Sequence, residues 1–348
     1  MRAARLYKAG EKFKIEDIEK PKLEKNTAII KVKTAGVCAT ELDFIEGIFP
    51  INPSPLVPGH EISGDIEEID QEVKTEYKAG DKVVVYNVMN CGTCWYCRND
   101  FENDCPNRKG QIGFTVDGGF EEYVKVPISS LTYLPPNVSY EEGAVLACSG
   151  MTAVHSTRRA GTKMGDVVAV NGIGGVGLMC IQVAKICGAR VIGISDSEEK
   201  AELAKKVGAD DTIIIPPPYD EYEKLGKEIR KITNGKGLDV YYELVGTTDT
   251  LNAGVDSLGI GGRLMIIGYK AEQNLNFYPV DLLVKEGQIL TSVAGCKRDL
   301  ELALQFANEK RANPIITNRI PLEKINDAIQ LIIDHKIRGR SVIMMDME

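Results

Sequence analysis

The pattern of hydrophobic and polar residues changes near residue 151. Before this point, apolar or alternating segments at residues 28–33, 61–66 and 82–85 are separated by proline and glycine turns, which is typical of a strand-rich domain. After it, apolar segments alternate with amphipathic helical patterns. The segments that predict strands lie at residues 167–170, 190–195, 213–215, 239–244, 263–267 and 289–293. The connections between them are long enough for parallel pairing, so this region is predicted to form a doubly wound α/β sheet.

The end of the chain returns to a different pattern after Gly295. It predicts a helix at residues 300–309, a second helix at 322–335 and a final strand at 340–344. The chain has 348 residues, which exceeds the roughly 250–300 residues at which a single hydrophobic core stops growing. Two domains are therefore expected.

The turn after the strand at 167–170 carries the glycine pattern G-x-G-x-x-G at Gly172, Gly174 and Gly177. Gly172 permits the tight turn, Gly174 lets the backbone approach a pyrophosphate, and Gly177 lets the next helix pack closely on the strand. A glycine pattern alone is weak evidence, because glycine turns are common. Here it lies between a strand and a helix, which favours a dinucleotide-binding turn over a merely structural one.

Two further features agree with dinucleotide binding. Exposed N–H groups at the start of the helix, which include those of Gly175 and Val176, would hold the phosphates. Asp196 lies 19 residues past Gly177, where an acidic side chain is expected to contact a ribose hydroxyl.

Composition and charge limit the possible partners. The net charge is -8 and the pI is about 5.2, which argues against nucleic acid or an anionic membrane as a partner. No apolar run approaches the roughly 18 residues of a membrane span, and the first residues lead into no signal-peptide core. We expect a cytoplasmic protein that acts on a small molecule.

Four of the nine cysteines lie close together in the sequence, at Cys91, Cys94, Cys97 and Cys105. Without a secretion signal, such a group favours metal binding over disulfides. Four thiolates suit a closed, tetrahedral structural zinc site. An iron–sulfur cluster is the rival interpretation, because the first three cysteines share ferredoxin-like spacing. A segment that binds no metal is a further alternative.

A second possible metal site is scattered along the chain. Cys38 follows a predicted strand, His60 and Glu61 follow a proline-rich loop, and Cys148 precedes the second domain. Three protein ligands and one open position are how proteins hold a catalytic zinc. Spacing alone does not separate this possibility from ordinary core residues.

These residues carry a resemblance to a known family. Gly59-His60-Glu61, the cysteines at residues 91–105, the segment 118–123 and the turn 172–177 resemble, in this order, the zinc-containing alcohol dehydrogenases of the medium-chain dehydrogenase/reductase superfamily. The resemblance implies a GroES-like, β-rich catalytic domain at residues 1–150, resumed by 296–348. It implies a Rossmann dinucleotide-binding domain at 151–295.

The resemblance also implies roles for individual residues and two zinc ions per chain. Cys38, His60 and Cys148 would hold the catalytic zinc, with Glu61 as an alternating ligand and Glu41 orienting His60. Cys91, Cys94, Cys97 and Cys105 would hold the structural zinc. The catalytic zinc would act as a Lewis acid on the alcohol oxygen, and a hydride would pass to the nicotinamide.

Two other positions resemble functional residues of this family. Thr40 matches the hydroxyl that takes the substrate proton, although it could be an ordinary threonine at a strand end. Many relatives continue this relay through a histidine three residues later, where this chain has Asp43. Arg340 resembles an arginine that binds the pyrophosphate, with a solvated arginine as the alternative.

The choice of cofactor depends on the residues after the second Rossmann strand. Ser195 stands where NAD-dependent relatives often have an acidic residue, but Asp196 follows it, and Lys200 is the first cation that could meet a 2′-phosphate. The acidic side chains favour NAD, with NADP as the alternative.

The substrate pocket is expected to include Ile48, Phe49, Asn87 and the region around Val293. Asn87 hints at a substrate with a second oxygen function, unless it is a structural residue of a turn.

The expected activity is hydride transfer between a nicotinamide cofactor and an alcohol, aldehyde or ketone. One alternative is an NADPH-dependent enoyl- or acryloyl-thioester reductase of the same superfamily, which needs no catalytic metal. The complete set of zinc ligands disfavours it. Another alternative is a non-enzymatic dinucleotide or redox sensor that uses the cysteine segment as a switch. The protein is expected to form a homodimer or homotetramer.

Overall fold

The computed structural model describes residues 1–216 and 222–347, and the chain divides into two compact units. The first unit comprises Met1–Met151 and Cys296–Glu348, and the second comprises Thr152–Gly295. The first unit is thus built from both ends of the sequence. In the part of the chain that the structure describes, no helix has the length and apolar character needed to cross a membrane.

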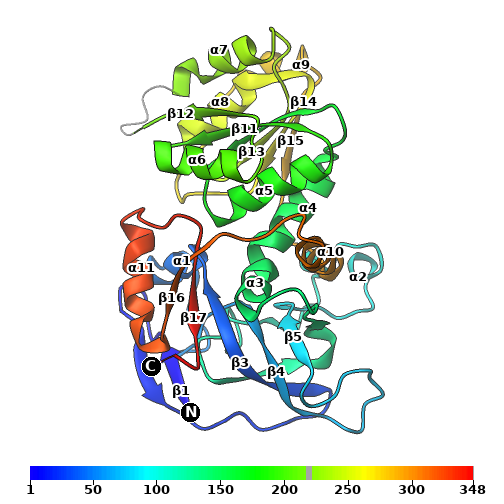
Figure 1. The fold of residues 1–348 in the computed structure, drawn as a ribbon, viewed down its shortest axis with the longest axis vertical. Helices are drawn as coiled ribbons and strands as arrows, with labels where there is room; N and C mark the ends of the chain where they lie inside the picture. Colours follow the sequence, from blue (N-terminus) through cyan, green and yellow to red (C-terminus); the bar gives the residue numbers. More distant parts are fainter. Residues whose placement is uncertain (217–221, 348) are drawn as a thin grey trace. The chain divides into compact units, whose positions relative to one another are not determined.

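The first unit is organised around a mainly antiparallel sheet (Figure 1). Its strands follow the order β16 (Ile316–Ile320), β17 (Arg340–Met344), β3 (Thr27–Val37), β4 (Glu61–Ile69), β5 (Lys82–Val85) and β9 (Leu131–Tyr133), and β8 (Tyr123–Pro127) also pairs with β3. The three strand segments predicted before residue 151 lie in β3, β4 and β5. β-Branched residues such as Ile30 and Ile62 fill the core beside this sheet, where their stiff side chains suit a pleated surface.

Shorter elements complete the first unit. The remaining strands are β1 (Arg2–Arg5), β2 (Lys14–Asp17), β6 (Val88–Met89) and β7 (Gly110–Gln111). The helices are α1 (Thr40–Ile45), α2 (Trp95–Arg98), α3 (Tyr140–Val145), α10 (Lys297–Asn308) and α11 (Ile325–Ile333), with short helical turns η1 (Glu102–Asp104), η2 (Ile128–Ser130), η3 (Leu146–Gly150) and η4 (Leu322–Lys324). The helix predicted at 322–335 is therefore a 3-10 turn followed by an α-helix that ends at Ile333.

The second unit contains a parallel sheet. Among residues 152–216 and 222–295 its strand order is β12 (Asp211–Ile214), β11 (Arg190–Ser195), β10 (Val167–Asn171), β13 (Leu238–Glu243), β14 (Leu258–Ile266) and β15 (Gln288–Thr291). This arrangement confirms the predicted doubly wound α/β class. β14 begins five residues before the predicted segment. The glycine-rich stretch before Arg263 also pairs with β13, through a shift in register, and a hydrophobic pattern does not predict such a shift.

Helices cover this sheet (Figure 1). They are α4 (Met151–Ala160), α5 (Gly175–Ile186), α6 (Glu198–Lys206), α7 (Tyr222–Ile232), α8 (Thr248–Ser257) and α9 (Pro279–Leu283). The chain moves outward from β10 to β12 and then returns to β13 on the other side of β10. Right-handed crossovers therefore place α5 and α6 on one face and α7 and α8 on the other. The order reverses between β10 and β13, and such a switch point opens a crevice at the carboxyl ends of the strands.

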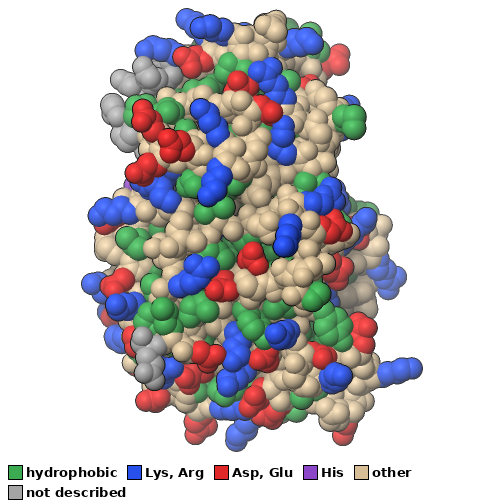
Figure 2. All heavy atoms as spheres, in the orientation of Figure 1, with side chains coloured by type: hydrophobic (Ala, Val, Ile, Leu, Met, Phe, Trp, Pro, Cys, Tyr) green, Lys and Arg blue, Asp and Glu red, His purple; other side chains and the backbone are tan. Residues whose placement is uncertain are grey.

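Charged side chains of both signs are interspersed on the face of the molecule shown in Figure 2. Pairs such as Lys185 with Asp210 (2.8 Å) and Arg190 with Asp211 (2.8 Å) place opposite charges side by side on the second unit. Such mixing keeps local potentials small, in agreement with the modest net charge of the chain.

Candidate active site

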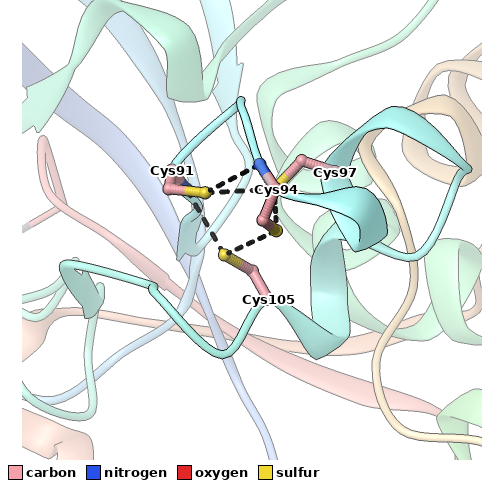
Figure 3. Close-up of side chains that lie close together, drawn as sticks. All are labelled: Cys91, Cys94, Cys97 and Cys105. Carbon is pink, nitrogen blue, oxygen red and sulfur yellow. Dashed lines mark hydrogen bonds between the residues drawn. The ribbon is translucent and has the colours of Figure 1, made fainter.

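The cysteines of residues 91–105, here called the cysteine lobe, point their sulfur atoms toward one another (Figure 3). Sγ of Cys97 lies 3.8 Å from Sγ of Cys91 and 3.5 Å from Sγ of Cys94, and Sγ of Cys94 lies 3.8 Å from Sγ of Cys105. Zinc holds sulfur at about 2.3 Å, which corresponds to an edge of about 3.8 Å in a tetrahedron. The lobe therefore fits a single ion, and the spacing is too small to enclose a cluster of several irons.

Backbone N–H groups prepare the lobe for thiolates. The N–H of Cys94 donates to Sγ of Cys91 (3.4 Å), and the N–H of Cys91 donates to Sγ of Cys105 (3.5 Å). Backbone donation from Thr93 and Cys94 lowers the pKa of Cys91 to about 5, whereas burial and the neighbouring thiols raise the pKa of Cys97 to about 12. A cation at the centre would favour the thiolate form of all four.

The lobe is attached to the start of α10. Sγ of Cys296 donates to the carbonyl of Asp100 (2.9 Å) and to Oδ1 of Asn103 (3.2 Å), and the N–H of Lys297 donates to Oε1 of Glu102 (2.8 Å). Cys296 is fully buried, and these bonds join the lobe to the C-terminal segment.

The second group of candidate ligands gathers at one end of the large sheet. Ligand atoms of Cys38, His60, Glu61 and Cys148 all lie within 4.8 Å of one another. Cys38 directly follows β3, His60 precedes β4, and Glu61 is the first residue of β4. Cys38, His60 and Glu61 are buried and Cys148 is half-buried. The structure therefore brings together all four residues that the sequence singled out.

Cys148 reaches this group from an unusual helical turn. It lies in the middle of η3, a π-helical turn between α3 and α4. A π turn contains one more residue than an α-helical turn and is often found at functional sites. Cys148 therefore lies in a helical turn that is wider than those of α3 and α4 on either side.

Arg340 joins the same group from the adjacent strand. β17 pairs with β3 so that Ser341 lies opposite Val37, which places Arg340 beside Cys38. Its Nη2 lies 2.6 Å from Oε1 of Glu61 and donates to Sγ of Cys148 (3.7 Å). Arg340 is only 7% exposed, so it is not a solvated arginine. Its predicted contact with a pyrophosphate stays a prediction.

Gly36 makes the position of Glu61 possible. The two residues are directly opposite each other on β3 and β4. A Cβ atom on Gly36 would lie 1.9 Å from Oε2 of Glu61, so any side chain there would displace the carboxylate. Sequence analysis did not single out Gly36, because its role depends on the pairing of two strands.

Glu41 lies between His60 and the backbone of Cys38. Its Oε1 is 3.1 Å from Nδ1 of His60, and its Oε2 accepts a hydrogen bond from the N–H of Cys38 (2.7 Å). Nδ1 therefore faces a carboxylate, which leaves Nε2 for a metal ion. Although burial lowers the pKa of His60, the neighbouring Glu41 raises it well above its usual value. The expected orientation of His60 by Glu41 agrees with this geometry.

The donor atoms of this group suit a cation. Cys38, Glu61 and Cys148 are acidic groups, and Oε2 of Glu61 is buried with no hydrogen-bond partner among the described residues. A bond from Cys148 lowers the pKa of Cys38 well below its usual value, whereas the same bond raises the pKa of Cys148 and burial raises the pKa of Glu61 to about 8. Without a metal ion, Cys148 and Glu61 therefore favour their protonated forms near neutral pH. Arg340 supplies a single positive charge. Two thiols, an imidazole and a carboxylate are a donor set that suits zinc.

Thr40 and Asp43 lie on the short helix that follows Cys38. Thr40 begins α1, and its Oγ1 is 3.3 Å from Sγ of Cys38. Asp43 lies one turn later, and its carbonyl accepts hydrogen bonds from the N–H groups of Ile48 (2.8 Å) and Phe49 (3.0 Å). The structure places the hydroxyl of Thr40 beside the candidate metal ligand Cys38. A proton relay through Thr40 stays a prediction.

In the second unit, the glycine turn has the geometry that dinucleotide binding needs. Gly172 has a φ of +100°, and a Cβ atom on Gly177 would lie 2.0 Å from the carbonyl oxygen of Gly172. Gly174 faces open space, and α5 begins at Gly175 with no side chain capping its first turn. The N–H groups of Gly175 and Val176 therefore lie at an uncapped helix start, which suits phosphate binding.

The residues expected near the ribose lie at the end of β11. Nζ of Lys200 is 2.7 Å from Oδ2 of Asp196, and Oγ of Ser195 donates to the carbonyl of Ser197 (3.0 Å). Oδ1 of Asp196 is buried with no hydrogen-bond partner in the described part of the chain. Lys200 is thus paired with a carboxylate, and a free carboxylate oxygen remains for a hydroxyl donor.

Known proteins resemble this chain over nearly its full length. Residues 24–136 match the alcohol dehydrogenase GroES-like domain family, and residues 175–309 match the zinc-binding dehydrogenase family. An alcohol dehydrogenase of Geobacillus stearothermophilus is 33% identical over 99% of this chain and 100% of its own length, and an NAD-dependent alcohol dehydrogenase of Sulfurisphaera tokodaii is 34% identical over 99% and 100%. The chain belongs to the zinc-containing alcohol dehydrogenases of the medium-chain dehydrogenase/reductase superfamily.

Two further comparisons describe the range of this family. The crystal structure of an alcohol dehydrogenase from Aeropyrum pernix matches with a TM-score of 0.90 and 30% identity, covering 99% of this chain and 100% of that chain. An acryloyl-coenzyme A reductase of Sulfurisphaera tokodaii is 33% identical over 95% of this chain and 96% of its own length. As a member of the alcohol dehydrogenase family, the protein is an oxidoreductase. The resemblance found in the sequence is confirmed.

Proposed function

We propose that this alcohol dehydrogenase uses NAD and zinc to transfer a hydride between the nicotinamide and an alcohol, aldehyde or ketone. The observation that carries the proposal is the buried group of Cys38, His60, Glu61 and Cys148. This group is a donor set for zinc, and a divalent cation bound there would stabilise the thiolate forms of its two cysteines.

The residues of the first unit would have distinct tasks in this reaction. Cys38, Cys148 and Nε2 of His60 would hold the metal, and Glu41 would fix the orientation of the imidazole. The bound zinc would supply Lewis-acid polarisation of the substrate oxygen. Oγ1 of Thr40 would accept the proton that the alcohol loses while its own hydroxyl proton passes on to water.

Glu61 would lie beside the metal as an alternating ligand. Its pairing with Arg340 at 2.6 Å supplies a countercharge for a carboxylate that is not bound to zinc. This arrangement supports the proposed alternating role of Glu61. The cysteine lobe would bind the second, structural zinc.

NAD is the favoured cofactor because of Asp196. Its unpaired Oδ1 can accept a ribose hydroxyl, and its pairing with Lys200 removes the first cation that could bind a 2′-phosphate. The Sulfurisphaera tokodaii relative named for NAD supports the same choice.

Asn87 supports a substrate with a second oxygen function. It lies two residues past Val85, which pairs with Ile62, and therefore lies at the same end of the sheet as His60. Its Oδ1 is buried without a hydrogen-bond partner among the described residues, although its backbone carbonyl accepts from Ile112 (2.8 Å). A side-chain amide that serves only to hold a turn would use this oxygen. We propose that Asn87, together with Ile48 and Phe49, contacts the substrate.

An acryloyl-thioester reductase is the second candidate function, because a relative of similar identity carries that name. This reaction reduces a carbon–carbon double bond and needs no catalytic metal. The retained metal-binding group disfavours it. Activity with acryloyl-coenzyme A in protein stripped of metal would favour it instead.

We further propose a cytoplasmic homodimer or homotetramer. β15 is an edge strand of the parallel sheet, and α9 exposes Leu283 (74%) on the same unit, with Tyr278 (77%) preceding it. An unpaired edge beside exposed apolar side chains is a common protein interface. Light scattering at several protein concentrations measures the assembly.

One experiment tests the main proposal. Zinc per chain is measured together with turnover on a panel of alcohols, aldehydes and ketones with NAD and NADP. Two zincs per chain and NAD-dependent alcohol oxidation are expected, with the highest efficiency for substrates that carry a second oxygen. A full activity that survives removal of the catalytic zinc would contradict the proposal.

A further inference from the structure

Glu243 ends β13 at the switch point of the parallel sheet, and no role in the reaction described above uses it. Its side chain is fully buried in the second unit. It is the neighbour of Asn171 on the adjacent strand β10. Glu243 and Asn171 thus bridge the two strands between which the strand order reverses, where a dinucleotide crevice is expected.

The carboxylate of Glu243 is surrounded by donors. Oε1 accepts hydrogen bonds from the N–H groups of Val245 (2.7 Å) and Gly246 (2.7 Å) and from Oγ1 of Thr250 (3.0 Å). Oε2 accepts from Nδ2 of Asn171 (3.0 Å). Four donors on one buried carboxylate hold the turn after β13 in a single arrangement.

The same residue connects the turn to its neighbours on both sides. The backbone carbonyl of Glu243 accepts from the N–H groups of Ile267 and Gly268, at 2.9 Å each, after β14. On the other side, Oδ1 of Asn171 accepts from the hydroxyl of Tyr222 (2.9 Å). Glu243 therefore joins the carboxyl ends of three neighbouring strands.

The turn that Glu243 holds packs directly on the glycine turn. A Cβ atom on Gly172 would lie 3.1 Å from Cγ2 of Val245 and 3.2 Å from Cβ of Leu244, and the N–H of Leu244 donates to the carbonyl of Asn171 (3.0 Å). Val245 and Leu244 thus lie in the space that a side chain at position 172 would need, and the turn at 244–246 packs close to the glycine turn. The glycine turn is itself closely packed, because a Cβ atom on Gly177 would lie 2.0 Å from the carbonyl oxygen of Gly172.

We propose that Glu243 is a positioning residue for the dinucleotide: its buried carboxylate fixes the turn at 244–246 against the glycine turn and so sets the shape of the crevice. The proposal rests on dinucleotide binding at Gly172–Gly177. Glu243 acts through these two turns, and no contact between Glu243 and the dinucleotide is needed.

The first test compares two substitutions of Glu243. Glu243→Leu removes all four hydrogen bonds, and the Kd for NADH, measured by fluorescence titration, is expected to rise at least tenfold. Glu243→Gln keeps an oxygen for Val245, Gly246 and Thr250, and its amide can pair with Asn171 once the Asn171 amide turns over. Its Kd is expected to stay within threefold of wild type. The KM for the alcohol and the zinc content stay unchanged in both.

A matched control separates positioning from stability. Thr233 is a buried residue of the same unit and lies close to the opposite end of β13. Its hydroxyl donates a hydrogen bond to the carbonyl of Ile229 (2.8 Å) and accepts one from the N–H of Gly237 (3.0 Å). Thr233→Val is expected to lower Tm without changing the Kd for NADH. Two outcomes would overturn the proposal. One is an equal rise in the Kd for NADH in Thr233→Val and Glu243→Leu when both lose the same amount of Tm. The other is a folded Glu243→Leu variant that binds NADH within twofold of wild type.

A charge exchange tests the proposal even if Glu243→Leu fails to fold. Asn171→Asp would place two carboxylates at hydrogen-bond distance, so the Kd for NADH should rise, and should rise less at lower pH where the pair shares a proton. Asn171→Asp combined with Glu243→Gln restores one donor and one acceptor, and the Kd should recover to within threefold of wild type. Lack of recovery contradicts the proposal. If the wild-type protein binds neither NADH nor NADPH, the proposed function itself is wrong.

Discussion

Nη2 of Arg340 lies 2.6 Å from Oε1 of Glu61, and both side chains are buried beside the candidate catalytic metal ligands. The arginine begins a strand near the C-terminus and the glutamate begins a strand near residue 60. The adjacency of β17, β3 and β4 is what brings them together. The countercharge of Glu61 is therefore supplied by β17, which is far from Glu61 in the sequence.

Arg340→Met should leave Glu61 buried without a countercharge. Because burial already raises the pKa of Glu61 to about 8, the loss in the free energy of unfolding is expected to reach about 3–5 kcal/mol only above that pH and to shrink at lower pH, where the lone carboxyl is protonated. Arg340→Met combined with Glu61→Gln should recover most of this loss. Urea denaturation of the single and double variants measures the coupling. If Arg340 also binds the pyrophosphate, the Kd for NADH will rise in both the single and the double variant. A Kd that recovers in the double variant together with the stability would contradict that role.

Cys105→Ser tests the cysteine lobe. The loss of one thiolate from a closed tetrahedral site should release the structural zinc and lower Tm by roughly 10 °C or more, because metal-binding energy is folding energy in such sites. Zinc analysis and calorimetry measure both effects. Cys187→Ser, at a half-buried cysteine of the second unit, is the control and should change neither. A Cys105→Ser variant that retains two zincs and its full Tm would remove the structural-zinc interpretation.

His60→Ala tests the catalytic site. With two thiolates left, the catalytic zinc should be lost, and turnover should fall by several orders of magnitude while the Kd for NADH stays within a few-fold. The zinc content should drop from two to about one per chain. His335→Asn is the control, because His335 is exposed and has a φ of +54°, which asparagine tolerates. Near wild-type turnover in His60→Ala would favour the metal-free reductase.

Asp196→Arg tests the choice of cofactor. It replaces the carboxylate that pairs with Lys200 by a cation, and the ratio of kcat/KM for NADP over NAD should rise about 10- to 100-fold, the value of one charge-assisted hydrogen bond. Adding Ser195→Gly should raise the ratio further. Asp210→Arg breaks the ion pair with Lys185 in the same unit and serves as the control. An unchanged ratio would show that Asp196 does not face the ribose.

Glu121 predicts a pH dependence of stability. Burial and the nearby charge of Asp117 raise the pKa of Glu121 well above its usual value, so the folded protein favours the protonated carboxyl. Its contribution to stability is complete below the unfolded pKa of about 4.5 and is lost as the pH rises through the folded value. Glu121→Gln should therefore be more stable than wild type at about pH 8, with the difference shrinking toward pH 4.5. The exposed Glu72→Gln should show no such trend in denaturation measured across this range.

The fold class and the family could be predicted from the sequence because their signals are local. The cysteines at 91–105, the glycine turn and the apolar strands each depend on residues that are near neighbours in the chain, and the predicted strands of both units are present. The sequence also singled out Cys38, His60, Glu61 and Cys148, which the fold brings together.

Other features depend on strand pairing and could not be found in this way. Gly36 matters only because it lies opposite Glu61, and Arg340 meets Glu61 only because β17 is inserted beside β3. The π turn around Cys148 leaves no hydrophobic pattern that differs from a continuous helix. Glu243 has an unremarkable place at a strand end until its four donors are known. Their roles follow from tertiary neighbours.

The place of β17 in the sheet also has a consequence for biosynthesis. A ribosome releases Cys38, His60, Glu61 and Cys148 while the second unit and the strand that begins at Arg340 are still missing. The nascent chain thus carries a complete set of metal ligands with neither the countercharge of Glu61 nor the strand that borders β3. Because β3 lacks this neighbour until β17 has left the exit tunnel, stable metal loading should wait for that strand, and a chain stopped before Arg340 should fail to retain zinc at this site although every ligand has been made.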